Sequence, residues 1–229
     1  MGRREQRREE RRNLLLESAM EILAEGGVEA LTIPRLAERM QASVGGLYRY
    51  FPSKEAIFVA LQERAIDAFD ALQEAGITRA DQRADQSSPA VQSLARVIAA
   101  FHALLDLATE APTQHALVDA FLSAPSPTLS DAQARDIEAY LTPVLERCAA
   151  QLEAASRSGA LSVADPMVRT HLLWAALHGL SHFRKRDRIQ REPLRVSALA
   201  PALLEGLLVG WGANHADVQS ALVVAEVIR

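Results

Sequence analysis

Apolar residues recur at helical spacing along this chain, and segments typical of strands are absent. Near the N-terminus Leu16, Ala19, Met20 and Leu23 stand at positions i, i+3, i+4 and i+7, the spacing that lines one face of a helix. Alanine and leucine dominate, aromatic residues make up 5% of the chain, and no turn-bounded runs of valine, isoleucine, threonine and tyrosine occur. The sequence therefore predicts an all-α protein.

Composition narrows the class of protein further. The 229 residues, 49% of them hydrophobic and 24% charged, suffice for a real core in one large or two small domains. Cys148 is the only cysteine, which excludes an internal disulfide and suits a reducing compartment. The charged start, MGRREQRREERRN, is unlike a signal peptide, and no segment reaches the roughly 20 apolar residues that cross a bilayer. We expect a cytoplasmic protein that does not enter the membrane.

Charge is unevenly distributed between the two ends of the sequence. The whole chain has a formal net charge of −4, yet residues 1–54 hold 10 arginines and lysines against 8 acidic residues, and the remainder holds 15 against 21. A positive end on an acidic body is what a phosphate-binding module attached to another domain requires.

Three short helices are predicted before Pro52. Gly26-Gly27 ends the first, Thr32 is placed to cap the second, and Pro34 falls in its first turn, where the missing N–H costs little. Gln41-Ala42-Ser43 then leads into a very short third helix. Two short helices joined by such a turn form a helix-turn-helix, which places its second helix in the major groove of DNA.

The stretch SVGGLYRYFPSK, residues 43–54, fits this reading. Its glycines allow the backbone to approach a duplex, its tyrosines offer hydroxyls to phosphates, and Leu47 and Phe51 point inward to hold the short helix. An ordinary helical hairpin with surface tyrosines is the alternative. The candidate DNA-binding residues are Thr32, Arg35, Ser43, Val44, Gly45, Gly46, Tyr48, Arg49, Tyr50 and Lys54.

These residues resemble the TetR family of transcriptional regulators. The likeness lies in LLESAMEILAEGGVEALTIPRLAERM and SVGGLYRYFPSKEAIF, between Leu15 and Phe58. It implies a DNA-binding domain over residues 1–53 and a helical ligand-binding and dimerisation domain over residues 54–229.

Four positions depart from the family pattern. Gln41 stands where glycine is usual, so it should adopt a left-handed conformation at a cost of roughly 1 kcal/mol. Val44 and Gly46 replace polar residues, and Pro34 replaces a side chain that contacts bases in some members. Few side chains at these positions can therefore hydrogen-bond to bases, and we expect Val44 to pack instead on a thymine methyl group.

The arm RREQRREERR, residues 3–12, allows three readings. Mixed arginine and glutamate at helical spacing form either a solvated extension of the first helix, or a disordered tail, or a segment that contacts DNA. The sequence leaves these open.

Longer helices follow Ser53, which is placed to cap a helix that we expect to end at Gly76. TRADQRADQSSP is predicted as a polar linker. A helix ended by Pro112, a shorter one to about Ala124 and a long one over about 130–158 complete the middle of the chain.

The last two major helices are apolar and contain small residues at close spacing. Asp165-Pro166 opens the first with an N-cap and an N1 proline, and LRVSALAPALLEGLLVGWGA forms the second. Such faces are too apolar for water, and the family resemblance likewise implies a C2 homodimer. The candidate interface residues are Leu172, Ala175, Ala176, Gly179, Phe183, Leu203 and Leu207.

The resemblance also implies a pocket for a small, mostly apolar effector in the C-terminal domain. Its candidate lining residues are Phe101, Leu105, His115, Phe121, Tyr140, Val144, Trp174 and His178, although aromatic residues at helical spacing more often serve packing.

Catalytic and metal chemistry have weak signals. His178 and His182 stand four apart, but no cysteine or carboxylate accompanies them at ligand spacing, so no metal and no cofactor is expected. No nucleophile elbow, phosphate loop or paired catalytic acids appear, so an enzyme is not expected. The sequence predicts a ligand-responsive, homodimeric repressor of a palindromic operator; the alternative is a helical ligand-binding or interaction dimer without specific DNA recognition.

Overall fold

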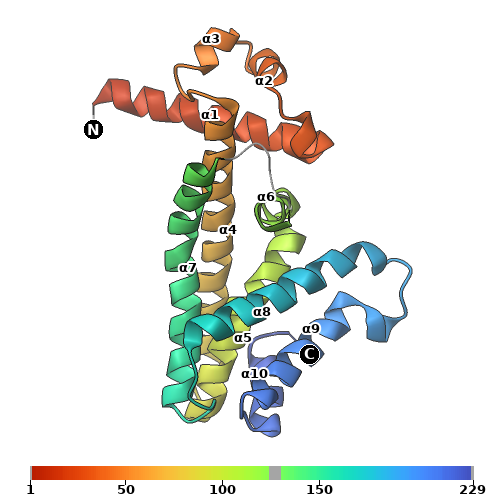
Figure 1. Cartoon of the computed structure of the whole chain (residues 1–229). Coiled ribbons are helices and arrows are strands. Elements are labelled where there is room, and N and C mark those ends of the chain that lie inside the picture. The colour runs from red at the N-terminus through yellow and green to blue at the C-terminus, as the bar shows by residue number, and fades with distance from the viewer. Residues whose placement is uncertain (1, 124–129, 228–229) are drawn as a thin grey trace. The chain divides into compact units, whose positions relative to one another are not determined.

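The computed structural model describes residues 2–123 and 130–227, and for residues 120–123 the backbone alone. Most of these residues are helical, and no strand occurs among them, which confirms the all-α prediction. Figure 1 shows the helices. They are α1 (Arg3–Gly26), α2 (Ile33–Arg39), α3 (Val44–Leu47), α4 (Lys54–Arg83), α5 (Pro89–Glu110), α6 (Pro112–Ser123), α7 (Asp131–Arg157), α8 (Pro166–Ser181), α9 (Val196–Gly210) and α10 (His215–Val224), with 3-10 turns η1 (Val28–Ala30), η2 (His182–Arg186) and η3 (Glu192–Leu194).

Two compact units divide the chain. Unit 1 holds Met1–Ile66 and Thr113–Ala139, and unit 2 holds Asp67–Pro112 and Tyr140–Arg229. The predicted helix-turn-helix segment lies entirely within unit 1.

Unit 1 is built on one apolar face of α1. The buried residues of α1 are Leu15, Leu16, Ala19, Ile22 and Leu23, which recur at the predicted helical spacing. α2 and α3 lie together on one side of α1 (Figure 1). Their main core residues, with those of the start of α4, are Leu36, Leu47, Phe51, Ile57 and Leu61, each at most 3% exposed.

Helix boundaries in unit 1 are set by local sequence. Gly27 ends α1 at a φ of 72°, and its N–H bonds to the Leu23 carbonyl at 2.8 Å. Thr32 caps α2 by accepting from the Arg35 amide at 3.3 Å, and Ser53 caps α4 by accepting from the Ala56 amide at 3.2 Å. The predicted cap residues are confirmed.

Unit 2 is centred on α5, whose apolar side chains are buried on nearly every face. α5 packs against α8 and α10, and α9 packs against both of these helices. By length and composition alone α5 could cross a membrane, but 72% of its most apolar 18-residue segment is buried inside the protein. α5 is therefore a core helix, whose apolar character serves packing.

The predicted end of the fourth helix at Gly76 is wrong, because α4 continues to Arg83. Half of the expected linker, Thr78–Arg83, is thus helical. A Cβ on Gly76 would lie 3.3 Å from the Ala99 carbonyl oxygen of α5. Glycine at this position allows α4 and α5 to approach closely and does not terminate the helix.

Candidate DNA-binding site

The turn between α2 and α3 adopts the strained geometry that its sequence predicts. Gln41 has a φ of 48°, so a non-glycine residue occupies the left-handed region. The Gln41 amide bonds to the Glu38 carbonyl at 3.0 Å, and the Ala42 amide bonds to the Ala37 carbonyl at 2.9 Å. These two bonds close α2 and turn the chain into α3.

α3 is seated by its buried side chains and presents its other face outward. Ser43 Oγ accepts from the Gly46 amide at 3.1 Å and so caps the helix. Leu47 and Phe51 are each 3% exposed, whereas Val44 is 42% and Tyr48 47% exposed. The inward pair anchors the helix, so the outward pair is fixed in position without being covered.

The two glycines of α3 differ in their surroundings. A Cβ built on Gly45 meets no atom of the chain within 4 Å, and its φ is not in the left-handed region. A Cβ on Gly46 would lie 3.2 Å from Ser43 Oγ. The described fold therefore explains the absence of a side chain at Gly46 better than at Gly45, where no contact within the chain requires glycine.

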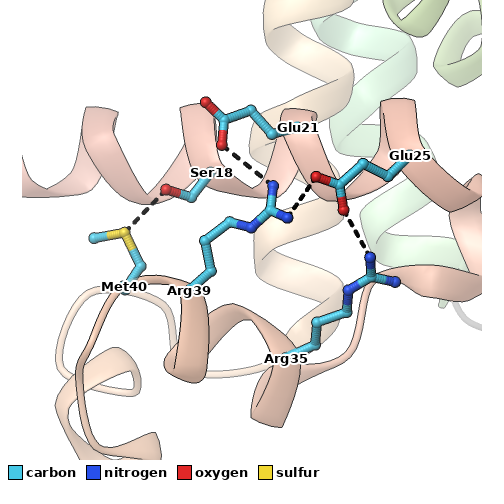
Figure 2. A network of polar contacts seen from close by, with 6 residues as sticks. All are labelled: Ser18, Glu21, Glu25, Arg35, Arg39 and Met40. Carbon is cyan, nitrogen blue, oxygen red and sulfur yellow. Dashed lines mark hydrogen bonds and ion pairs between the residues drawn. The ribbon is translucent and has the colours of Figure 1, made fainter.

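An ion network ties α2 to α1 (Figure 2). Arg39 Nη1 lies 3.2 Å from Glu21 Oε2, Arg39 Nη2 lies 2.5 Å from Glu25 Oε1, and Arg35 Nη2 lies 2.7 Å from Glu25 Oε2. The hydrogen bond from Arg39 is the main cause that lowers the pKa of Glu25, and the same bond raises the pKa of Arg39. Sequence reasoning missed this network, although its signal is visible as two acids four apart on one helix and two arginines four apart on the next.

Other predicted DNA-binding residues occupy varied positions. Arg35 is held by Glu25, and its side chain stays 41% exposed. Lys54 Nζ lies 5.4 Å from the ring centroid of Phe58. Arg49 is exposed, and Tyr50 is half-buried.

The predicted effector residues are mostly core residues of unit 2. Phe101, Val144 and Trp174 are 3%, 4% and 8% exposed, and the Trp174 indole N–H has no hydrogen-bond acceptor among the described residues. Tyr140 donates from its hydroxyl to Asp67 Oδ1 at 2.7 Å. The ring centroids of His178 and its neighbour His182 lie 4.9 Å apart, edge to face.

Of that set, Leu105 lines a cavity of about 260 Å³ in unit 2, together with His102, Asp106 and Arg184. His102 Nδ1 lies 3.1 Å from Asp106 Oδ1, and Arg184 donates to the Leu105 carbonyl at 3.1 Å. His115 belongs to unit 1 and is half-buried, and the Phe121 side chain lies outside the described residues.

The predicted interface residues leave apolar surface uncovered on α8. Leu172 on α8 is 52% exposed, and Phe183, just beyond the end of α8, is 45% exposed. Ala175 and Gly179 on α8 are exposed as well. Ala176, Leu203 and Leu207 are half-buried.

Comparison with known proteins places the N-terminal region. Residues 15–61 match the family described as bacterial regulatory proteins, tetR family. The transcriptional repressor KstR of Mycolicibacterium smegmatis is 42% identical over 62 residues, which cover 27% of this chain and 30% of KstR. The nucleoid occlusion factor SlmA of Actinobacillus pleuropneumoniae is 46% identical over 56 residues, covering 24% of this chain and 28% of SlmA. The chain thus spans less than a third of the length of these curated relatives.

Solved structures share the fold over most of the chain. A protein of unknown function from Rhodococcus sp. RHA1 aligns with a TM-score of 0.67 over 87% of this chain and 94% of its own, at 19% identity. AibR, solved with isovaleryl coenzyme A and operator DNA, aligns with a TM-score of 0.59 over 86% of this chain and 98% of its own, at 17% identity. RolR, solved with resorcinol, aligns with a TM-score of 0.58 over 94% of this chain and 95% of its own, at 20% identity. Over residues 15–61, which contain the helix-turn-helix, the chain is thus similar to the tetR family of bacterial regulatory proteins.

Proposed function

We propose that this chain is a transcriptional regulator that binds a double-stranded DNA operator through α3. The observation that carries the proposal is the arrangement of α3, in which Leu47 and Phe51 are buried while Val44, Gly45 and Tyr48 face outward. A helix anchored by buried side chains on one side is suited to enter a major groove with the other, because its contacting side chains are already positioned before binding.

The chemistry of the outward residues assigns their roles. Gly45 allows the α3 backbone to approach a phosphate, and Tyr48, Arg49 and Lys54 supply donors to phosphate oxygens. Val44 offers a methyl surface to a thymine methyl group. Thr32, Arg35, Ser43, Gly46 and Tyr50 complete the proposed contact set. Position and affinity would then come mainly from phosphate contacts, and discrimination from Val44 and DNA shape.

The same proposal includes a homodimer formed through α8 and α9. The exposed apolar side chains Leu172 and Phe183 flank the small residues Ala175 and Gly179, so a second copy could approach closely and cover this face. A C2 dimer would place two α3 helices about one DNA turn apart, some 34 Å, over a palindromic operator.

A small, mostly apolar effector bound in unit 2 would regulate DNA binding. The buried Trp174 indole supports an effector that carries one hydrogen-bond acceptor, because a buried N–H without a partner is rare. That RolR was solved with resorcinol and AibR with isovaleryl coenzyme A and operator DNA also supports this class of partner. A hundredfold release of operator requires about 2.7 kcal/mol of differential effector binding between two states, and repression relieved by effector is the expected outcome.

Selection from a random duplex pool with the purified full chain tests the proposal. One enriched palindrome supports a regulator with specific DNA recognition. A pool without enrichment supports the alternative, a helical ligand-binding or interaction dimer, which the unusual residues Val44, Gly46 and Pro34 favour. If a palindrome emerges, uracil in place of each thymine identifies the contact of Val44, since only the wild type and not Val44→Ala should lose affinity there.

A further inference from the structure

One stripe of α1 runs the full length of the helix on a single face. Its members recur at alternating steps of three and four residues, which keeps them in line on an α-helix. They are Arg4, Arg7, Arg11, Leu14, Ser18, Glu21 and Glu25.

The C-terminal half of this stripe is the surface on which α2 sits. Glu21 and Glu25 are neutralised by the two arginines of α2, and Ser18 Oγ lies 3.1 Å from Met40 Sδ at the end of that helix (Figure 2). Arg11 Nη2 donates to the Met40 carbonyl at 3.4 Å. The stripe therefore contacts α2 and its C-cap residue Met40 through polar groups.

The N-terminal half of the stripe continues beyond α2 with cations. Arg4, Arg7 and Arg11 are exposed and form no ion pair with any residue that the structure describes. Two of the three acids of the arm have partners away from this stripe: Glu5 Oε2 accepts from the Gly2 amide at 3.1 Å, and Glu9 lies 3.9 Å from Arg12. Helical geometry thus aligns Arg4, Arg7 and Arg11 in one row along the arm, although acidic residues stand between them in the sequence.

We propose that Arg4, Arg7 and Arg11 form a second DNA contact, which binds phosphates next to the site that α3 reads. This proposal rests on the proposed function, because it takes DNA bound at α3 as its reference. Two observations favour DNA as the partner of this surface. Its arginines are positively charged whereas DNA phosphates are negative, and the same stripe of α1 contacts α2, which precedes the proposed DNA-binding helix α3. Arginine suits this role since its planar guanidinium can give two parallel hydrogen bonds to a phosphate.

The helical state of the arm explains how it would bind. α1 begins at Arg3, so the arm is ordered before DNA arrives and binding costs little conformational entropy. Arg4 and Arg11 are about 10 Å apart along the axis, at 1.5 Å per residue, so they can reach different phosphates of one backbone. These contacts would add affinity without reading sequence.

The test compares three versions of the full chain on an operator duplex and on a duplex of random sequence. They are the wild type, the stripe variant Arg4→Gln/Arg7→Gln/Arg11→Gln, and the control Arg157→Gln/Arg188→Gln/Arg191→Gln. The control makes the same change in net charge at exposed arginines of unit 2. Glutamine has nearly the helix propensity of arginine, and circular dichroism checks that the arm stays helical.

Fluorescence anisotropy at several salt concentrations gives the slope of log affinity against log salt. The stripe variant should bind both duplexes more weakly, with a slope shallower by about 0.9 for each phosphate that the arm no longer neutralises and an unchanged ratio between duplexes. Arg4→Lys/Arg7→Lys/Arg11→Lys should restore most of the slope. Equal slopes for wild type and stripe variant on both duplexes would overturn the proposal, as would an equally large weakening in the control.

Failure of the arm and failure of the proposed function give different results. If no sequence is enriched from the random pool, specific regulation fails, and the random duplex alone still decides whether the stripe binds phosphates. If an operator is found and the stripe variant binds it like wild type, the arm proposal fails while the regulator stands.

Discussion

Replacing Gly45 with alanine should stabilise α3 and weaken DNA binding in the same molecule. The added Cβ meets no atom of the chain within 4 Å, and the backbone of Gly45 is not in the left-handed region, so the fold offers no steric resistance. Glycine in a helix costs about 0.5–1 kcal/mol relative to alanine, and a four-residue helix should recover the lower part of that range. Hydrogen exchange of the α3 amides should therefore slow by about twofold.

The DNA side of this prediction has the opposite sign. If the α3 backbone touches a phosphate at Gly45, the new methyl group breaks a hydrogen bond to a charged group, which is worth about 1.5–3 kcal/mol. Operator affinity should fall by about ten- to a hundredfold in a titration at fixed salt. Gly46→Ala is the contrast, because its Cβ would press on Ser43 Oγ at 3.2 Å and should not stabilise α3. Unchanged operator affinity of Gly45→Ala would refute the close backbone approach.

Three further predictions concern other parts of the chain. Arg39 lowers the pKa of Glu25 in the folded protein, so this pair stabilises the fold fully above the pKa that Glu25 has in the unfolded chain, and the stabilisation disappears as the pH falls through the lower pKa of the folded state. Glu25→Gln should therefore lower the free energy of unfolding measured in urea at pH 7 but not near pH 3. Leu172→Glu should yield a monomer in light scattering that binds operator poorly, whereas Ile189→Glu, on an exposed loop, should stay dimeric; a dimeric Leu172→Glu would argue against the α8 interface. Burial raises the pKa of Cys148 to about 12, so a thiol reagent at pH 8 should react at least roughly a hundredfold faster after unfolding, and fast native labelling would contradict that burial.

Local signals in the sequence were sufficient for much of unit 1. Thr32, Ser43 and Ser53 act as caps because a side-chain oxygen needs only the amides that follow it in the chain. Gln41 adopts the left-handed conformation that the two-helix turn demands. Such features depend on residues within a few positions of one another, so a single sequence carries them.

Contacts between distant segments could not be read in the same way. Gly76 looked like a helix end, since nothing in its neighbourhood reveals that Ala99 will press against it. The pairing of Arg39 with Glu21 and Glu25 depends on how α2 crosses α1, as does the hydrogen bond from Arg11 to the Met40 carbonyl.

The sequence by itself determined the helical class, the caps and the helix-turn-helix, because helical periodicity and capping are local properties. The tertiary structure alone decided which glycine packs and which stops a helix, and which charges are neutralised and which are left exposed. The physical reason is that steric approach and Coulomb pairing depend on distances across space, and chain order does not fix those distances until the helices have packed.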